Sequence, residues 1–368
     1  MEIEVLQKRL SKALNIVSRV AASTRAGLPI LSNVLLKAED KQLILTATNL
    51  ELATVEYVNA EAKKNGTITV PARLLAEFVS NLPSDETVKL KAKDSKLIIS
   101  AGKYKSTING ILADDFPELP EIEEKTAVKF SIDVDIFKEA VSEVIIAASN
   151  DTTRPALTGV YFNTFGGALY IAATDGYRLA DRKFVDKVKS EVKAIIPTNA
   201  LREVLSGLTD SVEAVEILVT DDQIRFRIGE VEITSKLIDA SFPDYRQLIP
   251  KENKATLVLD KAEIIRMTKV AALFARESGG SVVCEAKAKE DSFSIYAVAS
   301  EVGENSSDIT TDVSADGKVV LNSRYLLDAL NATAEEKIRF GFSGKLAPVV
   351  IKNEKNDEYT HIIMPLKS

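Results

Sequence analysis

Apolar residues recur at the spacing of one helix face in six segments of the chain, and short strand-like runs fill the stretches between them. Each third of the chain has two of these predicted helices. One lies early in the third, and the other contains Leu75, Leu201 or Leu327. The pattern predicts an α+β protein in which a unit of one helix and several antiparallel strands occurs six times. The apolar positions of the early helices are Leu10, Ala13, Leu14, Val17 and Val20, then Phe137, Val141, Val144 and Ala148, and finally Ile264, Met267, Ala271 and Phe274.

The chain contains a threefold internal repeat. Residues 71–82 (PARLLAEFVSNL) match residues 197–208 (PTNALREVLSGL), and both match residues 322–333 (NSRYLLDALNAT). The three leucines named above are 126 residues apart (201 minus 75, and 327 minus 201), and Phe116-Pro117 and Phe242-Pro243 keep the same spacing. Solenoid repeats are about 20 to 50 residues long, so this period indicates three copies of a whole domain.

Three domains are therefore expected, at residues 1–125, 126–253 and 254–368. Both boundaries fall in charged sequence of the kind found in exposed linkers. A chain of 368 residues is also too long to form a single hydrophobic core.

Composition describes an ordinary globular protein, with 45% hydrophobic and 27% charged residues. No run approaches the roughly 18 apolar residues of a membrane helix, and the start has no signal-peptide pattern, so a cytoplasmic protein without a membrane partner is expected. The net charge of −7 argues against a protein that coats nucleic acid through bulk positive charge.

Catalytic and metal-binding signatures are missing from the sequence. Cys284 is the only cysteine, and we expect it to be a small buried apolar residue. His361 is the only histidine, and we expect it to have a packing or surface role. No dinucleotide-binding, nucleophile-elbow or zinc-protease motif occurs. A hydrolase using Asp175 and Arg178 is conceivable, but Asp175-Gly176 is better explained as a tight hairpin turn. The sequence predicts a non-enzymatic protein with no cofactor and no metal.

Three further motifs follow one another in order: residues 173–180 (ATDGYRLA), 242–246 (FPDYR) and 363–366 (IMPL). With the triplication, and with residues 28–31 (LPIL) and 69–73 (TVPAR), they closely resemble the β subunits of bacterial DNA polymerase III. The resemblance covers the whole chain.

That resemblance implies the DNA-clamp (processivity) fold, with three similar domains that each contain two βαβββ units. It also implies a homodimeric ring that encircles duplex DNA without reading its sequence and confers processivity on the replicative polymerase. The implied partners are the DNA polymerase III catalytic subunit, the clamp loader and other proteins with a clamp-binding motif. A repeat-domain scaffold that binds only proteins is the alternative.

The resemblance also implies three sets of site residues. DNA contact is expected at Arg25, Arg73 and Arg154, although Arg154 could equally brace the peptide pocket. The dimer seam is expected to join Leu273 and Phe274 of one chain to the strand with Ser106 and Ile108 of the other, although the first pair could instead be core residues. The hydrophobic peptide pocket is expected to contain Leu157, Thr174, Gly176, Tyr177, Arg178, Leu179, Pro243, Arg246, Leu248, Asn322, Tyr325, Pro348, Ile362, Met364, Pro365 and Leu366.

Overall fold

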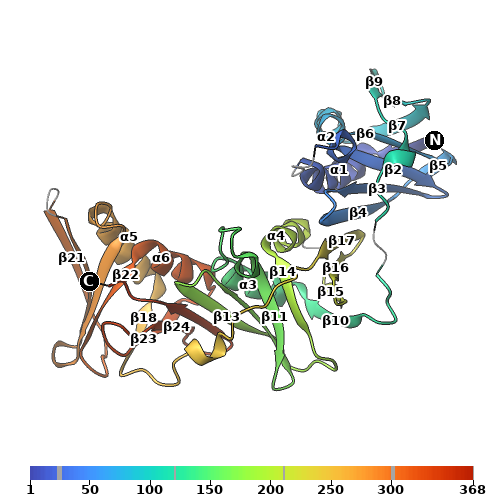
Figure 1. The fold of residues 1–368 in the computed structure, drawn as a ribbon. Coiled ribbons are helices and arrows are strands. Elements are labelled where there is room, and N and C mark those ends of the chain that lie inside the picture. The colour runs from blue at the N-terminus through green and yellow to red at the C-terminus, as the bar shows by residue number, and fades with distance from the viewer. Residues whose placement is uncertain (23–26, 120–121, 210–211, 300–302, 368) are drawn as a thin grey trace. The chain divides into compact units, whose positions relative to one another are not determined.

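The computed structural model of the chain describes residues 1–22, 27–119, 122–209, 212–299 and 303–367 (Figure 1). It divides into two compact units, one formed by Met1–Val134 with Asn199–Leu237 and the other by Asp135–Thr198 with Ile238–Ser368. Among the described residues, no helix is long and apolar enough to cross a membrane.

The first unit contains two sheets. One has five strands in the order β5-β1-β7-β8-β9, and the other has eight in the order β10-β15-β16-β17-β4-β3-β2-β6. Helix α1 packs on α2 and against strands of both sheets. The helices are α1 (Gln7–Ala22), α2 (Ala72–Ser80) and, from its second residue, α4 (Thr198–Gly207). The strands are β1 (Glu2–Leu6), β2 (Asn33–Glu39), β3 (Gln42–Thr48), β4 (Leu52–Asn59), β5 (Glu61–Lys64), β6 (Gly66–Pro71), β7 (Thr87–Lys93), β8 (Lys96–Ala101), β9 (Tyr104–Asn109), β10 (Val128–Asp133), β15 (Ala214–Val219), β16 (Gln223–Ile228) and β17 (Val231–Lys236).

The second unit repeats this plan. Its eight-stranded sheet has the order β14-β11-β12-β13-β25-β24-β23-β18, and its four-stranded sheet has the order β21-β20-β19-β22. Helices α5 and α6 pack side by side. The helices are α3 (Val134–Ile145), which enters this unit at its second residue, α5 (Lys261–Phe274) and α6 (Ser323–Ala332). The strands are β11 (Gly159–Phe165), β12 (Ala168–Thr174), β13 (Arg178–Val185), β14 (Lys193–Pro197), β18 (Ala255–Asp260), β19 (Ser281–Lys287), β20 (Ser292–Ala299), β21 (Gly303–Thr310), β22 (Gly317–Asn322), β23 (Lys337–Phe342), β24 (Val349–Asn353) and β25 (Tyr359–Ile363).

Each eight-stranded sheet crosses from one sequence repeat into the next. In the first unit β17 pairs antiparallel with β4, with Ser235 opposite Leu52. In the second unit β13 pairs antiparallel with β25, with Leu179 opposite Ile362. Strands that are far apart in the sequence therefore share one ladder of backbone hydrogen bonds at both junctions.

The predicted helices form because each has one apolar face. In α5, Ile264, Met267 and Ala271 are buried in the core of the second unit, while Leu273 points outward and is 55% exposed. The carboxylate of Asp260 accepts a hydrogen bond from the backbone N–H of Glu263 and so caps the first turn. Cys284 is fully buried, as expected, and burial raises the pKa of its thiol to about 12.

The structure corrects the register of the third sequence copy. Leu75 in α2 and Leu201 in α4 are fully buried, as the repeat predicts. At the corresponding position of α6, however, Leu326 is fully buried, and Leu327 is only partly buried. Helix α6 starts 125 residues after α4 (323 minus 198), so the spacing of 126 residues does not extend to Leu327.

One turn occurs twice with the same hydrogen bonds, 126 residues apart. In residues 48–52 and 174–178, the hydroxyl of the first residue donates to the carbonyl of the fifth, and the second side chain accepts from the backbone N–H groups of the fourth and fifth. The third residue has positive φ in both, 76° at Leu50 and 90° at Gly176. The carbonyl of the fourth residue accepts from a strand-end amide of the next repeat. The Asp175-Gly176 turn predicted from the sequence is confirmed.

A buried polar cluster lies at the junction of β13 and β25. Glu143 of α3 is fully buried, and its carboxylate lies 3.4 Å from Nε of Arg182 on β13. His361 is also fully buried, with its Nδ1 3.0 Å from the hydroxyl of Tyr359. Burial raises the pKa of Glu143 to about 7 even though Arg182 opposes this, and burial lowers the pKa of His361 to about 3. Of the packing or surface role expected for His361, the structure confirms the packing role, because the side chain is buried.

These two groups should give opposite pH dependences of stability. The raised pKa of Glu143 means that its contribution is fully present below about pH 4.5 and is lost as pH rises through 7. The lowered pKa of His361 means that its contribution is present above about pH 6.5 and is lost as pH falls toward 3. We expect Glu143→Gln to change the difference in unfolding free energy between pH 4.5 and pH 8 by roughly 3 kcal/mol in urea titrations. Parallel pH curves for the variant and the wild type would contradict this assignment.

Candidate functional site

All sixteen residues of the predicted peptide pocket lie in the second unit, and the chain end is tied to the repeated turn. The backbone N–H of Met364 donates to the carbonyl of Tyr177 at 2.8 Å. Two residues later, the N–H of Leu366 donates to the carbonyl of Val320 on β22 at 2.8 Å. The C-terminal tail therefore runs from the start of β13 to β22, and the structure brings together two parts of the predicted pocket that are almost 190 residues apart (364 minus 177).

The apolar members of this set are divided between buried side chains, called the floor below, and exposed side chains, called the rim. Leu179 and Ile362 pack with Tyr245, and the three are 2–3% exposed. Tyr177 at 64% and Leu248 at 60% are among the most exposed large apolar side chains described, and Met364 is 42% exposed. Apolar side chains that stay exposed over a buried apolar floor are typical of a surface that binds another molecule. We refer to this surface, from residues 174–179, 243–248 and 362–366, as the groove.

Arg178 is engaged within the protein rather than free to bind a ligand. Its guanidinium lies 3.0 Å from the carboxylate of Asp175 and 2.6 Å from that of Asp328 on α6. It also lies over the ring of Tyr325 at 4.5 Å from the centroid, and its side chain is 10% exposed. Arg178 therefore fixes the turn onto α6. Asp175 is engaged in the same turn, which leaves the hydrolase interpretation without a free acid at this position.

Two other polar residues expected to face a ligand also have internal roles. The side chain of Asn322 accepts from the backbone N–H groups of Arg324 and Tyr325, so it caps α6. The guanidinium of Arg246 stacks on the rings of Phe165 and Tyr170, at 4.3 Å and 4.1 Å from the centroids. Sequence alone gives the residue type but not the direction of the side chain, so these contacts could not be anticipated.

A hollow of about 340 Å³ opens beside the groove, and its lining adds a residue that the sequence interpretation missed. Arg154, one of the predicted DNA contacts, lies here with its Nη1 4.0 Å from where a Cβ on Gly176 would be. Arg324, from the first turn of α6, also lines the hollow. The place of Arg324 in the first turn of the helix, two residues after the predicted pocket residue Asn322, was the signal that could have identified it. The other lining residues are Ala148, Ser149, Asn150, Asp151, Asp175, Tyr177, Arg178 and Tyr325.

The other pocket residues vary in exposure. Pro243 is exposed, and Thr174 is 8% exposed at the end of β12. Leu157 lies in a short 3-10 helix, Pro155–Thr158, directly before β11. Leu157, Pro348, Pro365 and Leu366 are all partly buried.

The residues of the predicted dimer seam lie near sheet edges. Ser106 and Ile108 belong to β9, the last strand of the five-stranded sheet. Ile108 is 5% exposed within the single chain, and Ser106 is partly buried. Leu273 is exposed, whereas Phe274 packs against the core of the second unit. Helix α5, which carries both, packs on β21, the edge strand of the four-stranded sheet.

Of the two other predicted DNA contacts, the structure describes one. The side chain of Arg73 is 85% exposed and lies 2.8 Å from the carboxylate of Glu77, one turn later in α2. Arg25 lies outside the described residues. In the same unit, Lys8 and Arg9 at the start of α1 are exposed cations.

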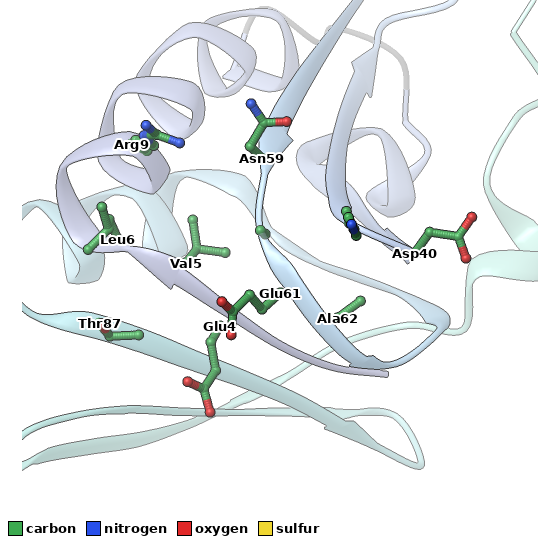
Figure 2. A pocket seen from close by; sticks show the side chains of 11 residues that line it. Glu4, Val5, Leu6, Arg9, Asp40, Asn59, Glu61, Ala62 and Thr87 are labelled. Carbon is green, nitrogen blue, oxygen red and sulfur yellow. The ribbon is translucent and has the colours of Figure 1, made fainter.

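A second hollow, of about 890 Å³, occurs in the first unit (Figure 2). Arg9 from α1, Asn59 at the end of β4 and Glu61 from β5 line it, as Figure 2 shows. Glu4 also lines the hollow, and its carboxylate is within ion-pair distance of Lys63 and Lys89, which do not line it. The lining mixes both signs of charge and includes none of the predicted pocket residues. Across the described parts of the chain, no cluster of His, Cys, Asp and Glu is arranged to hold a metal ion.

Comparisons with known proteins cover the whole chain. Residues 1–120, 131–244 and 246–367 match the family descriptions of the N-terminal, central and C-terminal domains of the DNA polymerase III beta subunit. A beta sliding clamp from Synechococcus elongatus is 30% identical over 100% of this chain and 99% of its own. One from Bacillus subtilis is 29% identical over 100% of both chains.

Solved structures agree with these matches. A sliding clamp from Pseudomonas aeruginosa, crystallised with bound griselimycin, has a TM-score of 0.94 at 29% identity over 100% of both chains. The sliding clamp from Bacillus subtilis has a TM-score of 0.93 at 28% identity over 100% of this chain and 99% of its own. The three-domain clamp fold expected from the sequence is confirmed, and the chain belongs to the DNA polymerase III beta subunit family, the beta sliding clamps.

Proposed function

We propose that this chain is the protomer of a DNA sliding clamp, in which two chains close head to tail around duplex DNA. The ring tethers the replicative DNA polymerase and gives it processivity, and it acts without catalysis or a cofactor. The observation that carries the proposal is the likeness over the full length to solved sliding clamps, at TM-scores up to 0.94. The domains proposed to build the ring are residues 1–125, 126–253 and 254–368, in the bacterial cytoplasm.

The charge of the chain supports a topological mode of DNA binding. With a net charge of −7, strong binding through many phosphate contacts is unfavourable. A ring does not need it, because enclosure retains DNA even when each contact is weak. Contacts with phosphates carry no sequence information, as a sliding protein requires.

The groove is proposed as the site where the polymerase, the clamp loader and other partners bind in turn. Its exposed rim of Tyr177, Leu248 and Met364 provides apolar contact area for a short hydrophobic motif. Met364 is unbranched and flexible, so it can adapt to different side chains. The partner class is therefore a hydrophobic peptide rather than a folded surface.

The decisive experiment is retention on circular DNA. The protein, loaded by its clamp loader onto a nicked plasmid, should migrate with the plasmid in gel filtration and should be lost once a restriction enzyme linearises the DNA. A scaffold that binds only proteins would still bind peptides but would never be retained on the circle. Equal retention on circular and linear DNA would refute the ring.

Weak DNA contact should depend on single arginines. Changing Arg25 or Arg73 to Ala is expected to weaken DNA binding by a few-fold and to reduce the dependence on salt by roughly one phosphate contact, while the dimer stays intact. Fluorescence anisotropy at several salt concentrations measures both quantities. Lys355→Ala removes an exposed cation of the second unit and is the matched control. If affinity and salt slope stay at wild-type values, that arginine does not contact DNA.

A further inference from the structure

The chain between the second and third repeats crosses one face of the eight-stranded sheet of the second unit. Phe242 stacks on Tyr161 of β11, with centroids 4.7 Å apart and an interplanar angle of 16°. Three residues later, Tyr245 is 2% exposed and packs with Leu179 and Ile362, which form the floor of the groove. Aromatic side chains thus attach this segment to the sheet on both sides of Pro243.

A buried carboxylate holds the second of these attachments. Asp181 is on β13, two residues after Leu179 and therefore on the same sheet face, and it is 6% exposed. The hydroxyl of Tyr245 donates to Oδ1 of Asp181 at 2.6 Å, and Nη2 of Arg246 lies 3.7 Å from the same oxygen. Burial raises the pKa of Asp181, while the hydrogen bond from Tyr245 and the charge of Arg246 oppose the rise. Desolvating a carboxylate is costly unless it is paired, so this position requires both partners.

Arg246 is held in turn by aromatic rings. Besides Phe165 and Tyr170, it lies 5.4 Å from the centroid of Tyr245. Phe165 is 56% exposed at the end of β11, so it contributes to this stack while leaving one side open to solvent. The guanidinium is thereby directed toward Asp181 and the aromatic rings, so its charge stabilises the segment that contains Arg246.

These contacts determine where the next groove residues lie. The N–H of Leu248 donates to the carbonyl of Tyr245 at 2.9 Å, and the N–H of Ile249 donates to the carbonyl of Arg246. The short helical turn Arg246–Leu248 therefore begins directly at the anchored tyrosine. Leu248 is exposed, and its backbone hydrogen bond to Tyr245 makes its position depend on that tyrosine.

We propose that Asp181 is a positioning residue for the peptide groove, which acts by anchoring Tyr245 and Arg246 so that Pro243 and Leu248 form a fixed wall for a bound hydrophobic peptide. The inference rests on the proposed function of the groove. Asp181 does not touch the peptide. It reduces the entropy that the wall would otherwise lose on binding, which is how preorganisation increases affinity.

The test uses the full-length dimer and a fluorescein-labelled hexapeptide rich in Leu and Phe that binds the wild-type protein. Tyr245→Phe keeps the apolar volume and removes only the anchoring hydroxyl, and Asp181→Leu removes the acceptor. Each variant is expected to bind the peptide about tenfold more weakly, the size of effect that follows from losing one hydrogen bond to a charged group. Asp181→Asn still accepts from Tyr245 and should restore most of the affinity lost in Asp181→Leu.

The control and a second readout separate positioning from a general loss of stability. Tyr161→Phe removes another hydroxyl from the same apolar cluster, one that donates to Asn163, and should leave peptide affinity unchanged. Amide hydrogen exchange at Leu248 should be faster in Tyr245→Phe but not in Tyr161→Phe. If Tyr245→Phe binds the peptide as tightly as the wild type, or more tightly, the positioning role is refuted. If removal of residues 364–368 leaves peptide binding unchanged, the groove itself is wrongly placed.

Discussion

Removal of residues 364–368 is expected to abolish binding of short hydrophobic peptides while the protein remains a dimer. The tail supplies the exposed side chain of Met364 and is attached to the repeated turn through the carbonyl of Tyr177. Its loss removes several apolar contacts at once and leaves that carbonyl without its partner. Burial of apolar side chains contributes about 1.5 to 3 kcal/mol each, so affinity should fall at least about a hundredfold. Isothermal titration calorimetry with the truncated protein measures this.

A shorter truncation is the matched control. Removing only residues 367 and 368 retains Met364 and the amide of Leu366, which bonds to Val320, so peptide affinity should stay at the wild-type value. The dimer should survive both truncations, since neither removes a residue of the proposed seam. Unchanged affinity in the longer truncation would place the groove elsewhere.

The combined change Leu273→Ala and Phe274→Asp is expected to convert the dimer into folded monomers. Leu273 is exposed at the end of α5, and an apolar side chain in that position is available to a second chain. The buried charge introduced at the seam would cost several kcal/mol, which is enough to move a micromolar dimer to monomers. Sedimentation should report 40.1 kDa, the mass of one chain, rather than twice that value.

Phe274 also packs on the core of its own unit, so its replacement carries a folding cost that must be separated from the seam. Leu273→Asp alone changes only an exposed position and should also weaken the dimer without lowering the melting temperature. Leu346→Asp is the control, because Leu346 is 73% exposed in the loop before β24 and is not part of the proposed seam. A double variant that still sediments as a dimer at low concentration would refute the seam.

Much of the fold could be predicted because it follows from local patterns. The six helices were visible in the apolar spacing, and the three domains were visible in the repeat. The turn at Asp175-Gly176 could also be predicted, because an Asp-Gly pair between two apolar runs is a strong hairpin signal. The error at Leu327 has a simple cause: residues 197–208 match residues 322–333 at an offset of 125 rather than 126 (322 minus 197), and the burial of Leu326 identifies it as the counterpart of Leu201.

The site was harder to predict because side-chain direction is set by tertiary packing. No sequence pattern indicates that Arg178 pairs with Asp328, 150 residues later, or that Arg246 stacks on Phe165 and Tyr170. Asp181 lies within a strand and is not part of any of the motifs recognised in the sequence. Its role depends on the sheet face that it shares with Leu179 and on the tyrosine that crosses that face.

The two eight-stranded sheets, each of which crosses one junction, determine whether a single repeat can exist alone. A fragment cut at residues 126 and 253 would retain its helices, but β17 would lose β4 and β13 would lose β25. Two newly exposed strand edges are templates for association with other chains, so such a fragment is expected to aggregate rather than fold as an independent module. The repeats are therefore alike in sequence but not autonomous, and each junction should unfold cooperatively with the strands on both of its sides.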